Sequence, residues 1–196
     1  MRWWFKAREI HTTLALGYAL FFLLAAFTVG HEIVLPSFLS GATAPVSFAM
    51  FAPVALCGAL LKSLDSRLHA AEDTSLRPVH LLDVALAAAV VIAAAMTGLA
   101  LWAAGSGDEA LVMGRNTAFL TGLMLCARAV VSQVAALVPI GWILLVILFG
   151  YGPSMHPYFW TVLARGSADP YALTGAALAF AAGLAAVLTA SHRTRT

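Results

Sequence analysis

The stretch Val84–Gly107 reads VALAAAVVIAAAMTGLALWAAGSG and contains no charged residue. An α-helix needs roughly 20 predominantly apolar residues to cross the hydrocarbon core of a bilayer. This stretch is longer than that and is dense in alanine and valine. It therefore predicts a transmembrane helix at residues 82–104, with Asp83 near its start and a Gly-rich loop after it.

Four other long stretches also lack Asp, Glu, Lys and Arg, and Asn116–Ala127 is a shorter one. Of the 196 residues, 62% are hydrophobic and 10% are charged, whereas a soluble domain carries about a quarter charged residues. So few charges cannot solvate the surface of a globular protein of this length. We therefore predict an all-α polytopic membrane protein in which residues 1–196 form a single transmembrane domain. The other long stretches are Ile10–His31, Ile33–Leu61, Ala129–Ala164 and Pro170–His192.

The charge-free stretches and the turn residues between them predict six transmembrane helices. Pro53 falls inside the second helix and is expected to kink it. The fourth helix has the least regular pattern, because its predicted range contains the charged residue Arg115 near its first residues. The predicted spans are residues 12–29, 45–61, 82–104, 110–127, 130–149 and 172–190.

Two aromatic segments are expected to lie at the membrane surface. The N-terminal MRWWFKAREI interleaves aromatic and basic side chains, a mixture that suits the headgroup layer and predicts a short interfacial helix. Residues 150–171, between the fifth and sixth spans, contain three prolines and several aromatic residues. We expect this second segment to pack at the outer face without crossing the membrane.

The distribution of Lys and Arg predicts that both termini are cytoplasmic. With six spans and an inner N-terminus, nine of the 11 basic residues fall on the cytoplasmic side, and only Arg115 and Arg165 fall outside. Cytoplasmic loops of membrane proteins carry an excess of Lys and Arg, and the opposite orientation would invert it.

Few polar groups lie near the spans, and each has two interpretations. His31 and Glu32 form the best pair for a proton or cation site, but a histidine at the membrane interface is also simply polar and partly hydrated. Asp83 is a functional candidate if it is buried, whereas near a helix N-terminus it would only favour the helix dipole. Arg115 and Asn116 either line a translocation path, or Arg115 snorkels to the outer surface.

No motif for catalysis or metal binding is present. The sequence contains neither GxSxG nor HExxH, and it has no Walker A motif with which to bind ATP. Cys57 and Cys126 lie inside apolar runs without CxxC spacing. We therefore expect no catalytic residue, no metal site and no cofactor in this chain, and no nucleic acid as a partner.

The most polar stretch of the chain joins the second and third spans and reads KSLDSRLHAAEDTSLRPVH, residues 62–80. Leu64 and Leu68 are four residues apart, the spacing that places two side chains on one face of a helix. Asp65, Arg67 and Glu72 fill the other faces. The stretch is either a connector or an amphipathic helix that docks on a cytoplasmic partner.

This layout resembles the membrane subunit of an ABC-2-type exporter. MRWWFKAREI corresponds to the interfacial helix of that family, KSLDSRLHAAED to its cytoplasmic coupling helix, and residues 150–171 to its outer re-entrant segment. The stretch RNTAFLTGLMLCARAVVSQVAALVPIGWILLVILFG is also similar to small permeases of actinobacterial peptide-export operons. The resemblance covers the whole chain in architecture.

The resemblance implies a multi-pass permease subunit in a bacterial cytoplasmic membrane. A separate ATP-binding cassette subunit would supply ATP and push the coupling segment through Leu64, Asp65, Arg67, Leu68 and Glu72. Two copies of the chain, or this chain and a second permease, would form a path for an amphiphilic or apolar substrate such as a peptide, drug or lipid. Two alternatives stay open. One is a membrane-bound enzyme or haem subunit that uses His31, Glu32 or Asp83; the other is a non-catalytic assembly protein.

Overall fold

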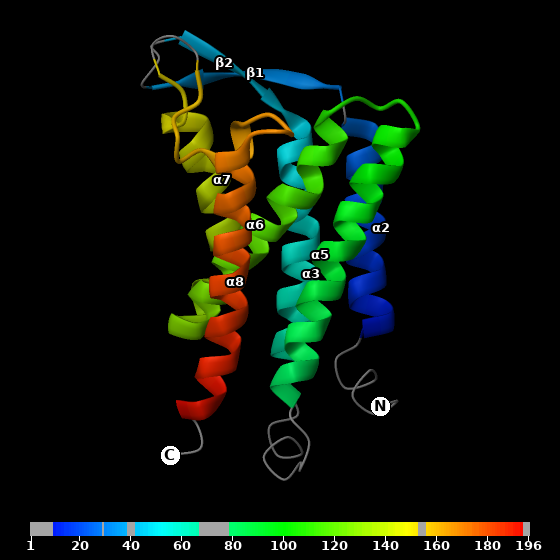
Figure 1. The fold of residues 1–196 in the computed structure, drawn as a ribbon, viewed down its shortest axis with the longest axis vertical. Coiled ribbons are helices and arrows are strands. Elements are labelled where there is room, and N and C mark those ends of the chain that lie inside the picture. The colour runs from blue at the N-terminus through cyan, green and yellow to red at the C-terminus, as the bar shows by residue number, and fades with distance from the viewer. Residues whose placement is uncertain (1–9, 29, 39–41, 67–78, 153–155, 194–196) are drawn as a thin grey trace.

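The computed structural model describes residues 10–28, 30–38, 42–66, 79–152 and 156–193. Within them, six α-helices run alternately in opposite directions between the two ends of the molecule (Figure 1): α2 (Ala15–Thr28), α3 (Ala52–Asp65), α5 (Val79–Ala103), α6 (Glu109–Val130), α7 (Leu137–Phe149) and α8 (Pro170–Arg193). The end at which α2 begins and α8 finishes is called the terminal end. The opposite end carries a β-hairpin and is called the hairpin end.

Four helical stretches are long and apolar enough to cross a membrane: Phe48–Asp65, His80–Ala103, Glu109–Val130 and Pro170–Thr189. Thr12–Thr28 and Leu137–Phe149 are apolar but shorter. The described residues thus confirm a mostly helical protein of the membrane type, while the count of six spans stays a prediction. The predicted interfacial helix falls largely on residues 1–9, outside the described residues, and a π-helical turn at Ile10–Leu14 precedes α2.

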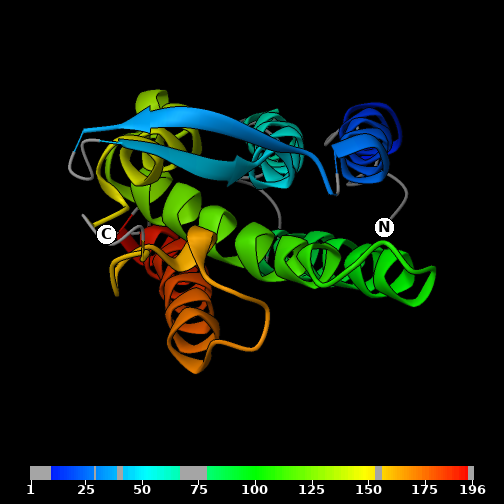
Figure 2. The same ribbon diagram turned by 90° about the horizontal axis from the view of Figure 1, so that it is seen from above.

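The connection between α2 and α3 is a β-hairpin, which the prediction of an all-α protein did not include, although the described residues are mostly helical. Strand β1 (Glu32–Ser37) pairs antiparallel with β2 (Ala42–Ser47). Each strand contains a proline, and proline in a short segment is also typical of a loop. The hairpin lies across the ends of α2, α3 and α7 (Figure 2), and the Phe38 N–H donates to the Leu148 carbonyl oxygen of α7 at 2.9 Å.

The start of the second helix also differs from the prediction. Helix α3 begins at Ala52, after a 3-10 turn, η2 (Phe48–Phe51), whose first residues are capped by the Ser47 hydroxyl oxygen accepting from the Ala49 N–H. Pro53 therefore lies in the first turn of α3 and not in mid-helix. A proline there loses no hydrogen bond, so Pro53 favours the helix start and does not kink the helix.

The predicted boundary between the fourth and fifth spans is displaced. Helix α6 continues to Val130 and ends at Val131, which has an extended backbone with φ −141°. A 3-10 turn, η3 (Ser132–Val134), follows, and α7 begins only at Leu137. The fifth helix is therefore shorter than residues 130–149.

The described residues between α7 and α8 contain no α-helix. They lie at the hairpin end (Figure 1) and include one 3-10 turn, η4 (Val162–Ala164). This agrees with the expectation that residues 150–171 do not cross the membrane as a helix. Their re-entry into the bilayer stays a prediction.

Helix α6 is the centre of the molecule. It crosses the bundle obliquely (Figures 1 and 2) and packs against α3, α5, α7 and α8. Of the α6 stretch, 67% is buried inside the protein, compared with 22% of the stretches that represent α5 and α8. The outer faces of α5 and α8 are therefore left for lipid, whereas α6 makes its contacts mainly with protein.

Two glycines allow α6 and α8 to touch backbone to backbone. A Cβ atom built on Gly122 of α6 would overlap the Ala179 carbonyl oxygen of α8. A Cβ atom on Gly183 of α8 would lie 2.6 Å from the Gly122 carbonyl oxygen. Small residues at such contacts drive helix association in membranes, where the hydrophobic effect does not hold helices together.

We expect Gly122→Ala to destabilise the protein by about 1–3 kcal/mol, because the added methyl group would collide with backbone atoms that cannot move aside. The matched control is Gly58→Ala in α3, where an added Cβ meets no atom within 4 Å. Thermal unfolding of both variants in detergent measures the difference. Equal stability of the two variants would contradict the close contact between α6 and α8.

Candidate functional site

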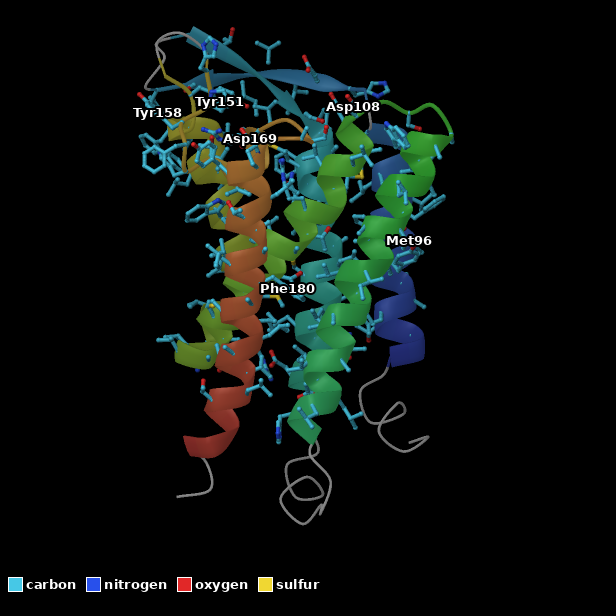
Figure 3. The ribbon with its side chains drawn as sticks, in the orientation of Figure 1. Met96, Asp108, Tyr151, Tyr158, Asp169 and Phe180 are labelled. Atoms are coloured by element: carbon cyan, nitrogen blue, oxygen red, sulfur yellow. The ribbon has the colours of Figure 1, made fainter. Side chains whose placement is uncertain are left out.

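A cavity of about 230 Å³ lies at the hairpin end, between the hairpin, the start of α6 and η4. Three carboxylates line it: Glu32 at the start of β1, Asp108 just before α6, and Glu109 as the first residue of α6. Arg165 and Tyr151 line it from the α7–α8 connection. The labelled residues Asp108, Tyr151 and Asp169 all lie at this end in Figure 3, whereas Phe180 lies near the middle of the bundle.

Glu109 joins three parts of the chain at this cavity. Its Oε2 atom accepts hydrogen bonds from the Gly30 N–H at 3.1 Å and the Ser47 hydroxyl at 3.0 Å. A carboxylate in the first turn of a helix also interacts favourably with the helix dipole. Glu109 therefore stabilises the start of α6 and holds both ends of the hairpin against it.

Arg115 holds the α7–α8 connection in place from within α6. Its guanidinium donates to three backbone carbonyl oxygens: Val162 at 2.9 Å, Arg165 at 2.7 Å and Gly166 at 2.6 Å. Arg115 is only 7% exposed. Its side chain is therefore held by backbone groups and does not extend freely into solvent, whereas a role for Arg115 along a translocation path stays a prediction. Its planar array of donors suits several acceptors at once.

Asn116 is adjacent in sequence and lies on the cavity wall. It is 2% exposed, and its side-chain amide donates to the Leu163 carbonyl oxygen at 3.4 Å. Its Oδ1 atom accepts from the Arg115 Nε at 3.4 Å. Asn116 therefore supports the Arg115 guanidinium and contributes one polar group to the cavity.

Asp169 fixes the start of α8 and pairs with Arg165. Its Oδ1 accepts from the Tyr171 and Ala172 N–H groups at 2.9 and 3.3 Å, and its Oδ2 lies 2.6 Å from the Arg165 guanidinium. The hydrogen bond from Arg165, and then those from the two N–H groups, lower the pKa of Asp169 below 3.8. A carboxylate with a depressed pKa stabilises the folded chain above its ordinary pKa. That contribution is lost as the pH falls through the lowered value.

Tyr151 presents a neutral side chain to the cavity. Burial raises its pKa, and the negative charge of Glu32 raises it further. The hydroxyl therefore stays protonated at neutral pH and adds no charge to this end of the molecule.

The structure separates the remaining polar candidates. His31 is exposed beside Glu32, and its carbonyl oxygen accepts from the Phe48 N–H at 3.2 Å. Asp83 is 2% exposed and lies in the first turns of α5, at the terminal end, so it is remote from the cavity. Within the described residues, no group of three His, Cys, Asp or Glu side chains is close enough to hold a metal ion.

Two of the predicted coupling residues belong to α3. Leu64 is 0% exposed and packs in the core, so its side chain is not available to a partner in this structure, contrary to the prediction. Asp65 pairs with Arg128 of α6 at 2.8 Å, and Arg128 also donates to the Leu64 carbonyl oxygen at 3.1 Å. The other three, Arg67, Leu68 and Glu72, lie outside the described residues.

Comparison with protein-family models, with curated proteins and with solved structures finds no match for the chain.

We expect Arg115→Met to destabilise the protein by about 3 kcal/mol, because three backbone carbonyl oxygens of the α7–α8 connection would lose their donor. Hydrogen exchange should then quicken in residues 156–169, and thermal unfolding in detergent gives the loss of stability. The matched control is Lys62→Met, which removes an exposed basic side chain. If both variants unfold at the same temperature with unchanged exchange, Arg115 does not hold this connection.

Proposed function

We propose that the chain is the permease subunit of an ABC-type exporter and works with a separate ATP-binding subunit. One observation carries the proposal. The start of α2, the end of α8, the end of α3 and the start of α5 all lie at the terminal end, whereas the hairpin and residues 156–169 lie at the opposite end (Figure 1). An exporter subunit that receives force between its second and third helices on the side of its termini needs this arrangement.

All six helices cross the bacterial cytoplasmic membrane in this proposal, with both termini in the cytoplasm. At 1.5 Å per residue, α2 and α7 are shorter than the hydrocarbon core, which is about 30 Å thick. A π-helical turn continues α2 at Ile10–Leu14, and η3 precedes α7. A bilayer accommodates a short helix by local thinning at modest cost. The excess of Lys and Arg in the sequence before α2, between α3 and α5 and after α8 supports the orientation.

The substrate would be amphiphilic or apolar, such as a peptide, drug or lipid, because the helices offer few fixed charges. The backbone contact at Gly122 and Gly183 leaves no room for a substrate between α6 and α8. The path would therefore form between two permease chains, either two copies of this one or this chain and a second permease. The chain would hold no cofactor, and ATP would be bound by the partner.

Motion would pass from the terminal end to the hairpin end through α6. A push on residues 67–78 would reach α3, whose last turn is joined to α6 by the Asp65–Arg128 pair. At its other end, α6 carries Arg115, which holds the α7–α8 connection, and Glu109, which holds the hairpin. A displacement of α6 would therefore move both parts of the outer end together.

The topology is tested by single-cysteine labelling from outside the cell, after replacement of Cys57 and Cys126 by serine. Ser106→Cys and Ala168→Cys should react with a membrane-impermeant maleimide, because both positions lie at the hairpin end. Ser66→Cys should react only after the membrane is permeabilised. Labelling of Ser66→Cys in intact cells would refute the orientation.

The ATPase partnership is tested by replacing residues 67–73 with Gly and Ser, which leaves α3 and the Asp65–Arg128 pair intact. We expect this variant to insert normally but to lose co-purification with the ATP-binding subunit encoded beside the gene, and to lose stimulation of its ATP hydrolysis. The matched control is Phe159→Ser, an exposed change at the hairpin end. Full binding and stimulation by the replaced chain would rule out this segment as the contact. A haem absorbance band in a chain that binds no ATPase would favour a redox subunit instead.

A further inference from the structure

Exposed aromatic side chains mark the hairpin end of the helices. Four of the six described α-helices carry one in the turn that lies at this end, namely Phe27 of α2, Trp102 of α5, Phe149 of α7 and Tyr171 of α8. Aromatic residues gather at the level of the lipid headgroups in membrane proteins, because that layer is apolar on one side and wet on the other. This pattern indicates that the hairpin end of the helices lies at one surface of the bilayer.

The hairpin adds a further aromatic ring beside the end of α7. Strand β1 ends at Ser37, and the ring of the next residue, Phe38, stacks on Phe149 with 6.1 Å between the ring centroids. Two hydrogen bonds join the segments, because the Leu148 carbonyl oxygen accepts from the Phe38 N–H at 2.9 Å and from the Ser37 hydroxyl at 3.4 Å. Phe38 is nevertheless 73% exposed. The hairpin therefore holds this ring on the outside of the bundle and does not bury it in the core.

The α7–α8 connection adds a third ring to the same region. The Tyr158 N–H donates to the carbonyl oxygen of Gly150, the residue just past the end of α7, at 3.0 Å. The Tyr158 side chain is exposed and lies at the outer edge of the bundle in Figure 3. Phe38, Phe149 and Tyr158 are called the aromatic edge. Backbone pairing of this kind suits irregular segments that lie against lipid, where unpaired backbone groups are costly.

The aromatic edge continues the apolar outer side of α7. Exposed apolar residues follow one another along this helix up to its last residue: Leu137, Ile140, Leu144, Leu145 and Phe149. The proposed function places this side of α7 against lipid. The hairpin brings no charge to the edge, because the sequence from Ile33 to Leu61 contains no Asp, Glu, Lys or Arg. An uncharged apolar surface that is continuous with a lipid-facing side fits a lipid surface.

We propose that the β-hairpin is a membrane-contact element whose Phe38 inserts into the lipid headgroup layer beside the end of α7, together with Phe149 and Tyr158. The partner is the lipid surface at the hairpin end. The hairpin is then anchored twice, in lipid at its turn and on α6 at its other end, where Glu109 accepts from the Ser47 hydroxyl. This inference rests on the insertion of α7 in the membrane, which the proposed function includes, and it needs no ATPase.

The depth of the hairpin is measured with nitroxide labels on single cysteines, in the full chain in phosphatidylcholine nanodiscs, after replacement of Cys57 and Cys126 by serine. Power saturation compares collisions with molecular oxygen, which dissolves preferentially in the bilayer, and collisions with a water-soluble nickel chelate. A label at Leu144→Cys, on the outer side of α7, gives the ratio of oxygen to nickel collisions for lipid. We expect the ratio at Phe38→Cys to lie well above that at Val34→Cys and to approach the ratio at Leu144→Cys.

Val34 is the matched control, because it belongs to the same hairpin and is 66% exposed. Its neighbours Ile33 and Leu35 pack against the core, so Val34 lies on the opposite face of β1. That face points away from the bundle, since the hairpin lies across the helix ends (Figure 2). A label at Val34→Cys should therefore collide mainly with the nickel chelate. Phe38 does not continue this alternation, because β1 ends at Ser37.

A label at Tyr158→Cys tests the same edge without altering the stack of Phe38 on Phe149, and it should also report lipid. Ratios at Phe38→Cys and Tyr158→Cys as low as at Val34→Cys would overturn the proposal, while a lipid-like ratio at Leu144→Cys would leave the insertion of α7 standing. A low ratio at Leu144→Cys as well would overturn both. Labels at the edge that neither reagent reaches would show that protein covers it, for example a second copy of the chain, and this would also overturn the lipid contact.

Discussion

A buried guanidinium must find its hydrogen-bond partners within the protein, and Arg115 finds three in the backbone at Val162, Arg165 and Gly166. These carbonyl groups belong to an irregular connection that no α-helix or sheet satisfies. The arginine therefore gives the connection a fixed conformation, and that conformation sets where α8 begins. Asp169 then caps α8 and pairs with Arg165. Arg165 and Gly166, which these contacts position, form one part of the wall of the cavity at the hairpin end.

Helix α6 combines three roles that are usually divided among several helices. Its first residue, Glu109, accepts a hydrogen bond from the hairpin, and Arg115 in its second turn donates to the α7–α8 connection. Arg128 in its last turn donates to a carbonyl oxygen at the end of α3. Its middle carries Gly122, where it meets α8 at backbone distance. Helix α6 is correspondingly less apolar: its mean hydropathy is 1.3, compared with 2.4 for the α5 stretch. Protein contacts, more than lipid, keep this helix in place.

The sequence predicted α5, α6 and α8 to within a few residues, because long charge-free stretches with polar ends leave little freedom in placing a membrane helix. It did not predict the hairpin, because two short strands with one proline each show no clear alternation of apolar and polar residues that would distinguish them from a loop. It singled out Arg115 but not its partners, since a backbone carbonyl has no signature in a sequence. Asp169 before Pro170 was readable as a helix start. The cavity was not predictable from the sequence, because Glu32 and Glu109 come to line the same space only when the chain folds.

The contact between Arg115 and Gly166 joins residues 51 positions apart, so α6 is synthesised well before its partners exist. At about 5–20 residues per second, the ribosome needs roughly 3–10 s to supply them. During that interval the guanidinium is without the backbone carbonyl oxygens that later accept its hydrogen bonds. The contacts that bury Arg115 can therefore form only after residues 162–166 have been synthesised.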